Sequence, residues 1–186
     1  MKKIAKGINL AAVGLLMIAL NINLDLGAMT INILPDWLGL ILLFLAVGQF
    51  EDKKHRYLPL KLLIIIATIY DMAAWGLSFV HHNFDLFIPN IVYSIVQMII
   101  FWSVTSITIR VARESSSSYV GSLVTIRGIQ LVSQILNMAM SLLTVYIDEW
   151  FAMGVTVTGV ILLLAVIITI VILFAFKKEY REKQEA

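Results

Sequence analysis

The chain of 186 residues contains no cysteine and few charged residues. Without cysteine it forms no disulfide bond, no thiolate metal site and no cysteine nucleophile. Charged residues make up 14% of the chain, whereas a soluble globular domain carries about 25%. The shortage is concentrated in long uncharged stretches, which excludes an ordinary soluble fold. These stretches are continuously apolar rather than alternating, which argues against a transmembrane β-barrel.

The recognisable motifs of enzymes are also missing. The chain has no HExxH zinc motif, no GxSxG nucleophile turn, no P-loop and no glycine-rich dinucleotide turn. Its aspartates lack the glycine-aspartate context of intramembrane aspartyl proteases. We therefore expect a protein that is not an enzyme, uses no cofactor or metal, and binds no nucleic acid.

What the chain does contain is six apolar segments. A helix needs about 20 residues to cross the hydrocarbon core of a bilayer. The segments predict an all-α fold, a polytopic transmembrane bundle that forms a single domain over residues 1–186. The expected helices are residues 8–26, 35–50, 58–80, 86–109, 126–147 and 150–176. The fifth has two candidate starts, near Tyr119 or near Ile126, because Arg127 either turns back toward the interface or follows an interfacial segment.

The placement of positive charge predicts the orientation. With the N-terminus inside, all 14 lysine and arginine residues fall in cytoplasmic segments, as the positive-inside rule requires. They are Lys2, Lys3 and Lys6; Lys53, Lys54, Arg56 and Lys61; Arg110, Arg113 and Arg127; and Lys177, Lys178, Arg181 and Lys183. The expected outer loops hold acids instead, namely Asp25, Asp36, Asp85, Asp148 and Glu149. We expect a multi-pass protein of the bacterial cytoplasmic membrane with both termini in the cytoplasm.

Asp71 is the one acid far from any expected helix end. It lies nine residues before Val80, or about 13 Å along the helix axis, which is near the bilayer centre. A charged acid at that depth costs at least about 2.5 kcal/mol. Asp71 must therefore face protein or water, take up a proton, or bind a cation.

Three consecutive expected helices carry polar residues at helical spacing. The third has Thr68, Asp71, Trp75, Ser78 and His82; the fourth has Asn90, Ser94, Gln97 and Thr108; and the fifth has Gln130, Gln134, Asn137, Ser141 and Thr144. Because their depths agree, we expect these faces to meet at a cluster of Asp71, Gln97, Gln134 and Asn137. The second and sixth helices would then face mostly lipid.

This cluster favours a protein that binds or transports a small polar solute or ion. Asp71 would bind a proton or a cationic or polar group, and the three amides would supply hydrogen bonds. The alternative is a structural or regulatory membrane protein, because such amides also join helices to one another. Pro35-Asp36 has two interpretations as well: it is a helix-start signal, or Asp36 has a functional role.

A second polar group is His81-His82-x-x-Asp85 in an expected outer loop. Imidazole and carboxylate groups bind transition metals, but the spacing matches no known site. The group is therefore interpreted as a polar loop at the interface, with metal binding as the alternative.

Two resemblances add to this picture. The segment Ile33–Leu40, ILPDWLGL, resembles the first hairpin of small uncharacterised polytopic membrane proteins of Gram-positive bacteria, and it implies the same compartment. In size, six helices and inside termini, the chain also resembles the substrate-binding subunits of energy-coupling-factor vitamin transporters. That resemblance would imply an ATP-driven partner, which those subunits contact through an alanine-x-x-x-alanine pair. Here Gly7 and Ala11 form the nearest such pair.

Overall fold

The computed structural model describes residues 2–19, 23–25, 30–32, 35–52, 56–78, 87–143 and 149–185. In these ranges it contains six helices and one short antiparallel hairpin, so the expected all-α class with six helices is confirmed. The elements are α1 (Lys2–Ala19), β1 (Asn23–Asp25), β2 (Thr30–Asn32), α2 (Asp36–Phe50), α3 (Leu58–Ser78), α4 (Phe87–Glu114), α5 (Val120–Leu143) and α6 (Glu149–Glu185). The expected outer loop with His81, His82 and Asp85 lies outside the described residues.

Four of the helices are long and apolar enough to cross a membrane. These stretches are Leu58–Leu77, Ile91–Glu114, Val120–Met140 and Met153–Glu185. Helix α2 is apolar but has only 15 residues, which span about 22 Å, less than the hydrocarbon core of about 30 Å. The chain thus has the helices of a membrane-embedded protein, together with one apolar helix that is too short to cross by itself.

Helices α1 and α6 depart most from the expected bounds. The apolar run predicted helix at residues 8–26, but α1 begins at Lys2 and ends at Ala19, and residues 23–25 form β1. The prediction was wrong there because asparagine and aspartate compete with helical backbone hydrogen bonds. Helix α6 continues beyond residue 176 through the charged tail to Glu185. Lys183 Nζ lies 2.7 Å from Glu179 Oε1, four residues earlier, and this ion pair stabilises the extension.

The start of α5 settles the two alternatives at Arg127. The helix begins at Val120, so residues 120–126 are helical and continuous with the rest of α5. Arg127 donates from Nη1 to Ser106 Oγ at 2.8 Å. Its guanidinium also lies 4.0 Å from the centre of the Trp102 ring. Arg127 is therefore held against α4 inside the continuous helix.

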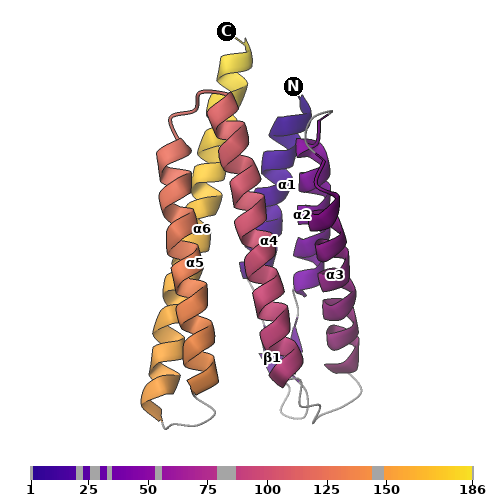
Figure 1. The fold of residues 1–186 in the computed structure, drawn as a ribbon, viewed down its shortest axis with the longest axis vertical. Coiled ribbons are helices and arrows are strands. Elements are labelled where there is room, and N and C mark those ends of the chain that lie inside the picture. The colour runs from indigo at the N-terminus through magenta and orange to yellow at the C-terminus, as the bar shows by residue number, and fades with distance from the viewer. Residues whose placement is uncertain are drawn as a thin grey trace.

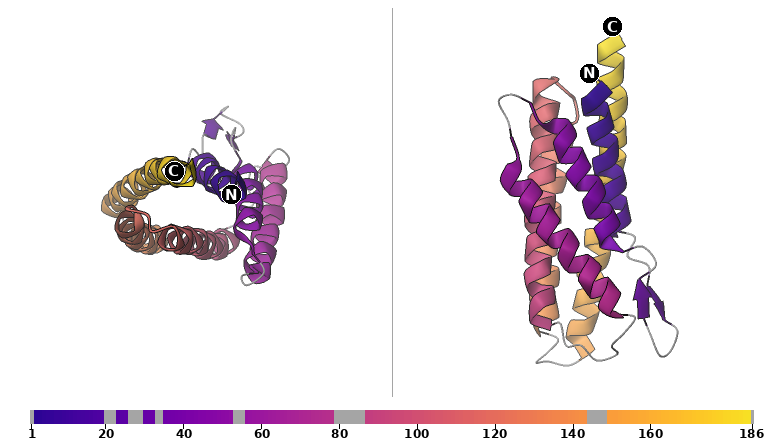
Figure 2. Two further views of the ribbon diagram at one scale, coloured as in Figure 1. Left: turned by 90° about the horizontal axis from the view of Figure 1, so that it is seen from above. Right: turned by 90° about the vertical axis from the view of Figure 1, so that its right-hand side faces the viewer.

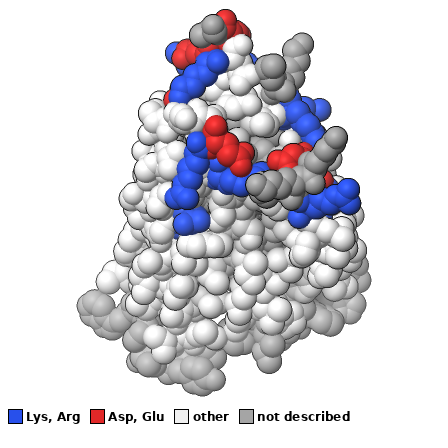
Figure 3. Space-filling model, turned by 45° about the horizontal axis from the view of Figure 1, so that its top comes forward, with Lys and Arg blue, Asp and Glu red and all other residues white. Residues whose placement is uncertain are grey.

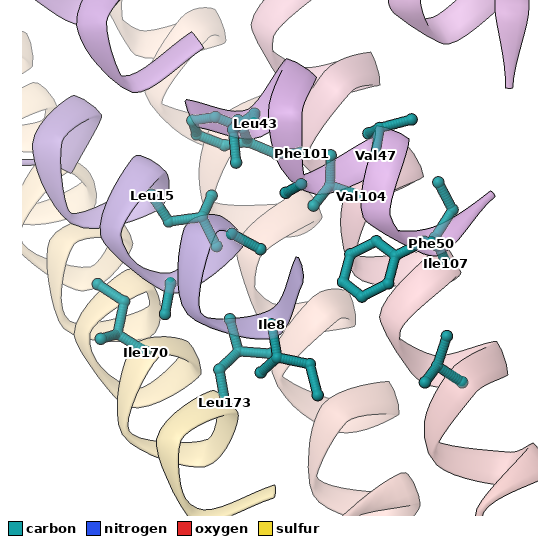
Figure 4. Packing of buried hydrophobic residues seen from close by; sticks show 14 of the residues in the cluster. Ile8, Leu15, Leu43, Val47, Phe50, Phe101, Val104, Ile107, Ile170 and Leu173 are labelled. Carbon is teal, nitrogen blue, oxygen red and sulfur yellow. The ribbon is translucent and has the colours of Figure 1, made fainter. Parts of the chain in front are cut away.

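The helices form a closed ring in which sequence neighbours are spatial neighbours. Seen from above, α6 returns to lie beside α1 (Figure 2). The N- and C-termini lie at the same end (Figure 1), and Lys and Arg side chains gather there (Figure 3). The buried core joins α1, α2, α4 and α6 through residues such as Ile8, Leu43, Val104 and Leu173 (Figure 4).

The expectation that the second helix faces mostly lipid is wrong, whereas α6 has one exposed apolar face and one buried face. Helix α2 buries seven residues, from Asp36 to Phe50, and α6 contributes Ala165, Ile170 and Phe176 to the core. Helix α3 is the exposed one, with Ile66 and Ile69 each 62% exposed. An apolar side chain suits lipid and protein neighbours equally well, so hydrophobicity alone did not distinguish them.

Glycine allows α1 and α2 to approach closely. A Cβ atom on Gly39 would lie 2.5 Å from Ile18 Cγ1 and 2.6 Å from the Gly14 carbonyl oxygen. No real side chain fits at such distances, so the crossing requires glycine on α2. Small residues at transmembrane helix crossings commonly permit this contact. The crossing fixes the position of α2, and with it Asp36, one turn earlier.

Candidate functional site

Helix α2 begins inside the bundle rather than at its outer surface. Pro35 precedes it in an extended conformation, with φ −66° and ψ 140°. Asp36 Oδ2 accepts a hydrogen bond from Gln97 Nε2 at 2.9 Å. Gln97 is ten residues from the start of α4, or about 15 Å along its axis. The assignment of Asp36 to an outer loop is therefore wrong: its carboxylate lies at the depth of the middle of α4.

Asp36 is buried with incomplete hydrogen bonding. The residue is 8% exposed. Its Oδ1 atom is buried and has no hydrogen-bond partner among the described residues. None of the ion pairs formed within the described ranges includes Asp36. A buried carboxylate usually has all its acceptor positions filled or a cation beside it, so this oxygen is the exception that needs an explanation.

A cavity of about 220 Å³ lies beside Asp36. Its polar lining is Asp36 from α2, Gln97 from α4 and Gln134 from α5. The remaining lining is apolar and includes Ile18, Phe101, Leu162 and Val166. Five of the six helices thus contribute to one small chamber with a carboxylate and two amides in its wall.

Asp71 has a different position from the one expected. Its Oδ2 accepts a hydrogen bond from the backbone amide of Trp37 at 2.8 Å, and it does not line the cavity. Pro35 provides no side-chain cap for α2, so Asp71 satisfies one of the free amides of that helix start from a neighbouring helix. The negative charge also suits the positive end of the helix dipole. The carboxylates of Asp36 and Asp71 nevertheless repel each other.

The polar face of α5 divides between two roles. Gln130 donates to Thr169 Oγ1 at 2.8 Å, and Asn137 donates to the Val155 carbonyl at 3.2 Å and to Thr158 Oγ1 at 3.1 Å. These bonds join α5 to α6. Of the expected cluster, the structure brings Gln97 and Gln134 to one cavity, whereas Asp71 and Asn137 bond elsewhere.

Asp36 is the member that the sequence analysis did not include. The signal was the length of the second apolar segment, residues 35–50. It is too short to cross about 30 Å of hydrocarbon, so one of its ends had to lie below the surface. The end that carries an acid after a proline was the one to examine.

Two acids at the opposite end of the bundle, Glu179 and Glu51, have several partners each. Glu179 accepts hydrogen bonds from Ser117 Oγ at 2.7 Å and from the Ser118 amide at 3.2 Å, in addition to its ion pair with Lys183. Glu51 accepts from Lys61 Nζ and from the Tyr57 amide. The hydrogen bond from Lys61 is the main reason that the pKa of Glu51 is lowered.

Metal binding finds no support in the part of the chain that the structure describes. No group of three or more histidine, cysteine, aspartate or glutamate side chains gathers there. Comparison of the chain with protein-family models, with curated proteins and with solved structures found no match. The geometry at the start of α2 is therefore the basis for any functional conclusion.

Proposed function

We propose that this chain is a six-span protein of the bacterial cytoplasmic membrane that binds or transports a small polar solute or ion in the cavity beside Asp36. Both termini would lie in the cytoplasm. The segregation of all lysine and arginine residues to the predicted inner segments supports this orientation, and the two termini share the end where the basic side chains gather.

One observation supports the binding function above all others: the buried Asp36 carboxylate faces a cavity with one oxygen lacking a hydrogen-bond partner among the described residues. An acid inside a membrane protein costs free energy unless it is paired or used. A structural role would favour hydrogen bonding between side chains of neighbouring helices, as seen for Gln130 and Asn137 on the same polar face of α5 as Gln134. A ligand in the cavity would complete the bonding of Asp36.

The helix arrangement supports the same proposal. Short helices that start within the membrane direct their backbone amides and dipoles at binding sites in many transporters. Here the start of α2 lies between α1, α3 and α4. The binding group would sit at this start, with α1 and α6 closing the chamber from the other side.

An ATP-driven partner of the energy-coupling-factor type receives less support. Ala11 and Ala12 on α1 are fully buried within the chain. A Cβ atom on Gly7 would lie 2.9 Å from Gln49 Cβ on α2. The small residues that would have contacted a partner are used for internal packing, which favours a chain that acts without such a module.

The binding proposal is tested by thermal unfolding of the purified protein in detergent, with a panel of amino acids, nucleobases, water-soluble vitamins and alkali-metal chlorides. A ligand raises the melting temperature by linkage. We expect at least one solute to raise it for the wild type and not for Asp36→Asn. Asp52→Asn, which changes an exposed acid just beyond the other end of α2, is the control and should keep the response. No response across the panel, or the same response in Asp36→Asn, would overturn the proposal.

The orientation is tested separately because the chain lacks cysteine. Single cysteines placed by Asn83→Cys and Ser116→Cys report each side of the membrane through a maleimide that does not cross it. In intact cells we expect labelling of the first variant and no labelling of the second until the cells are opened. The reverse pattern would disprove inside termini.

A further inference from the structure

We infer that the cavity binds a small organic ammonium, with its charged nitrogen at the Asp36 carboxylate and its hydrocarbon body against the apolar side chains of the wall. This inference rests on the proposed function and names the class of its ligand. It draws on the charge of the site, the composition of its wall and its size.

The charge of the site calls for a cation from outside the chain. Asp36 is 8% exposed, and none of the described residues that line the cavity is a lysine, arginine or histidine. A buried carboxylate is stable when a positive charge accompanies it. With no such group in the wall, the ligand is the group that supplies the positive charge.

The composition of the wall favours an organic cation over a bare metal ion. Hard metal ions take about six or more oxygen ligands. Among the described residues, the lining has three polar side chains, and the other side chains, such as Phe101, Leu162 and Val166, are apolar. These apolar side chains suit the aliphatic or aromatic part of an amphipathic amine.

The hydrogen-bonding pattern selects a nitrogen that carries N–H groups. Gln97 Nε2 donates a hydrogen bond to Asp36 Oδ2 at 2.9 Å and so orients the carboxylate, whose Oδ1 has no hydrogen-bond partner among the described residues. A charged N–H donor forms a shorter and stronger bond to a carboxylate than a neutral donor does. A quaternary ammonium has no N–H group, so it would neutralise the charge of the carboxylate without donating a hydrogen bond.

The size limits the body of the ligand. An apolar protein cavity of about 150 Å³ holds one benzene molecule. The cavity beside Asp36 is about 220 Å³, enough for a six-carbon ring and an ammonium group.

Calorimetric titration of the full-length protein in detergent tests the inference with benzylammonium chloride, benzyl alcohol, tetramethylammonium chloride and sodium chloride. We expect benzylammonium to bind at least tenfold more tightly than benzyl alcohol, and tetramethylammonium and sodium to bind more weakly still. Asp36→Asn should lose at least tenfold in affinity for benzylammonium and little for benzyl alcohol. Asp52→Asn, an exposed acid at the other end of α2, should match the wild type.

A second variant guards against misfolding of Asp36→Asn. Leu162→Trp fills part of the cavity and keeps the acid, so it should also weaken benzylammonium binding. Equal affinities for benzylammonium and benzyl alcohol, or unchanged affinity in both variants, would overturn the ammonium inference. If a neutral polar solute from the panel binds in an Asp36-dependent way while benzylammonium does not, the ligand class is wrong and the proposed function stands. If no compound binds, both fail.

Discussion

Two acids at opposite depths of the bundle contrast sharply in their surroundings. Glu179, in the charged extension of α6, bonds to Ser117, Ser118 and Lys183. Asp36, at the buried start of α2, accepts one hydrogen bond and leaves Oδ1 without a described partner. The acid that water can reach is fully bonded, and the acid that hydrocarbon surrounds is not. The hydrogen bonds of Glu179 therefore hold the loop after α4, which explains its structural role. Asp36 has an acceptor atom, Oδ1, that no described residue uses.

Asp36 is buried because α2 starts below the end of the bundle, and the close crossing of α1 and α2 at Gly39 holds α2 at that depth. Gly39→Ala introduces a Cβ atom 2.6 Å from the Gly14 carbonyl, and α1 and α2 must separate. We expect a loss of about 2–3 kcal/mol in the free energy of unfolding, as for other overpacked sites. Unfolding by sodium dodecyl sulfate in mixed micelles measures it.

Gly76→Ala is the matched control for that variant. Gly76 lies within α3, and nothing stands within 4 Å of the position that its Cβ would take. Alanine has the higher helix propensity, so this substitution should stabilise the protein by about 0.5–1 kcal/mol. Equal effects of the two substitutions would show that the close crossing is not what positions α2.

The second prediction separates charge from hydrogen bonding at Asp71. Asp71→Asn keeps an acceptor for the Trp37 amide and removes the repulsion toward Asp36. Asp71→Leu removes both. We expect Asp71→Leu to be less stable than Asp71→Asn by about 1–2 kcal/mol, because it leaves the partly buried Trp37 amide without this acceptor. Equal stability of the two variants in the same micelle assay would contradict the capping role.

The third prediction concerns Glu179, the acid with several hydrogen-bond partners. Glu179→Gln loses the ion pair with Lys183 and weakens the hold on Ser117 and Ser118. Since ion pairs near water contribute little, the loss should stay below about 1 kcal/mol. Amide hydrogen exchange in residues 115–119 should nevertheless become faster. Glu182→Gln, whose ion pair with Lys178 is longer at 3.9 Å, should leave that exchange unchanged.

The smallest effect is the dependence of stability on pH through Glu51. Folding lowers its pKa, chiefly through the hydrogen bond from Lys61. A lowered pKa in the folded state means that this stabilisation is complete above the ordinary value of 4.5 and is lost as the pH falls below it. We expect the drop in melting temperature between pH 6 and pH 4 to be smaller in Lys61→Met than in the wild type. An identical drop would exclude this pair as a source.

The sequence predicted the number of helices and several of their ends, because these follow from local properties. The starts of α2 and α3 agree with the predicted ones within one residue, since Pro35 and the charged cluster before Leu58 interrupt the helix. The end of α1 was misjudged because an apolar run shows which residues tolerate lipid and not where the helix stops.

The site was predicted only in part because helical periodicity identifies a face and not its neighbour. The polar stripe of α5 was recognised correctly as a stripe, but Gln130 and Asn137 bond to α6, not to α3 or α4. Gln134 alone among the expected α5 residues lines the cavity. Asp36 was placed too near the surface because the helix-start signal at Pro35 outweighed the short length of the apolar segment that follows it.

The glycine crossing has a mechanical consequence. With Gly14 and Gly39 in backbone contact, α1 and α2 behave as one stiff unit, while α5 and α6 are tied together by Gln130 and Asn137. The chamber lies at the seam between these two units. A small rigid-body rotation of one helix pair relative to the other would widen or narrow the cavity. The hydrogen bonds and close contacts within each pair would stay intact.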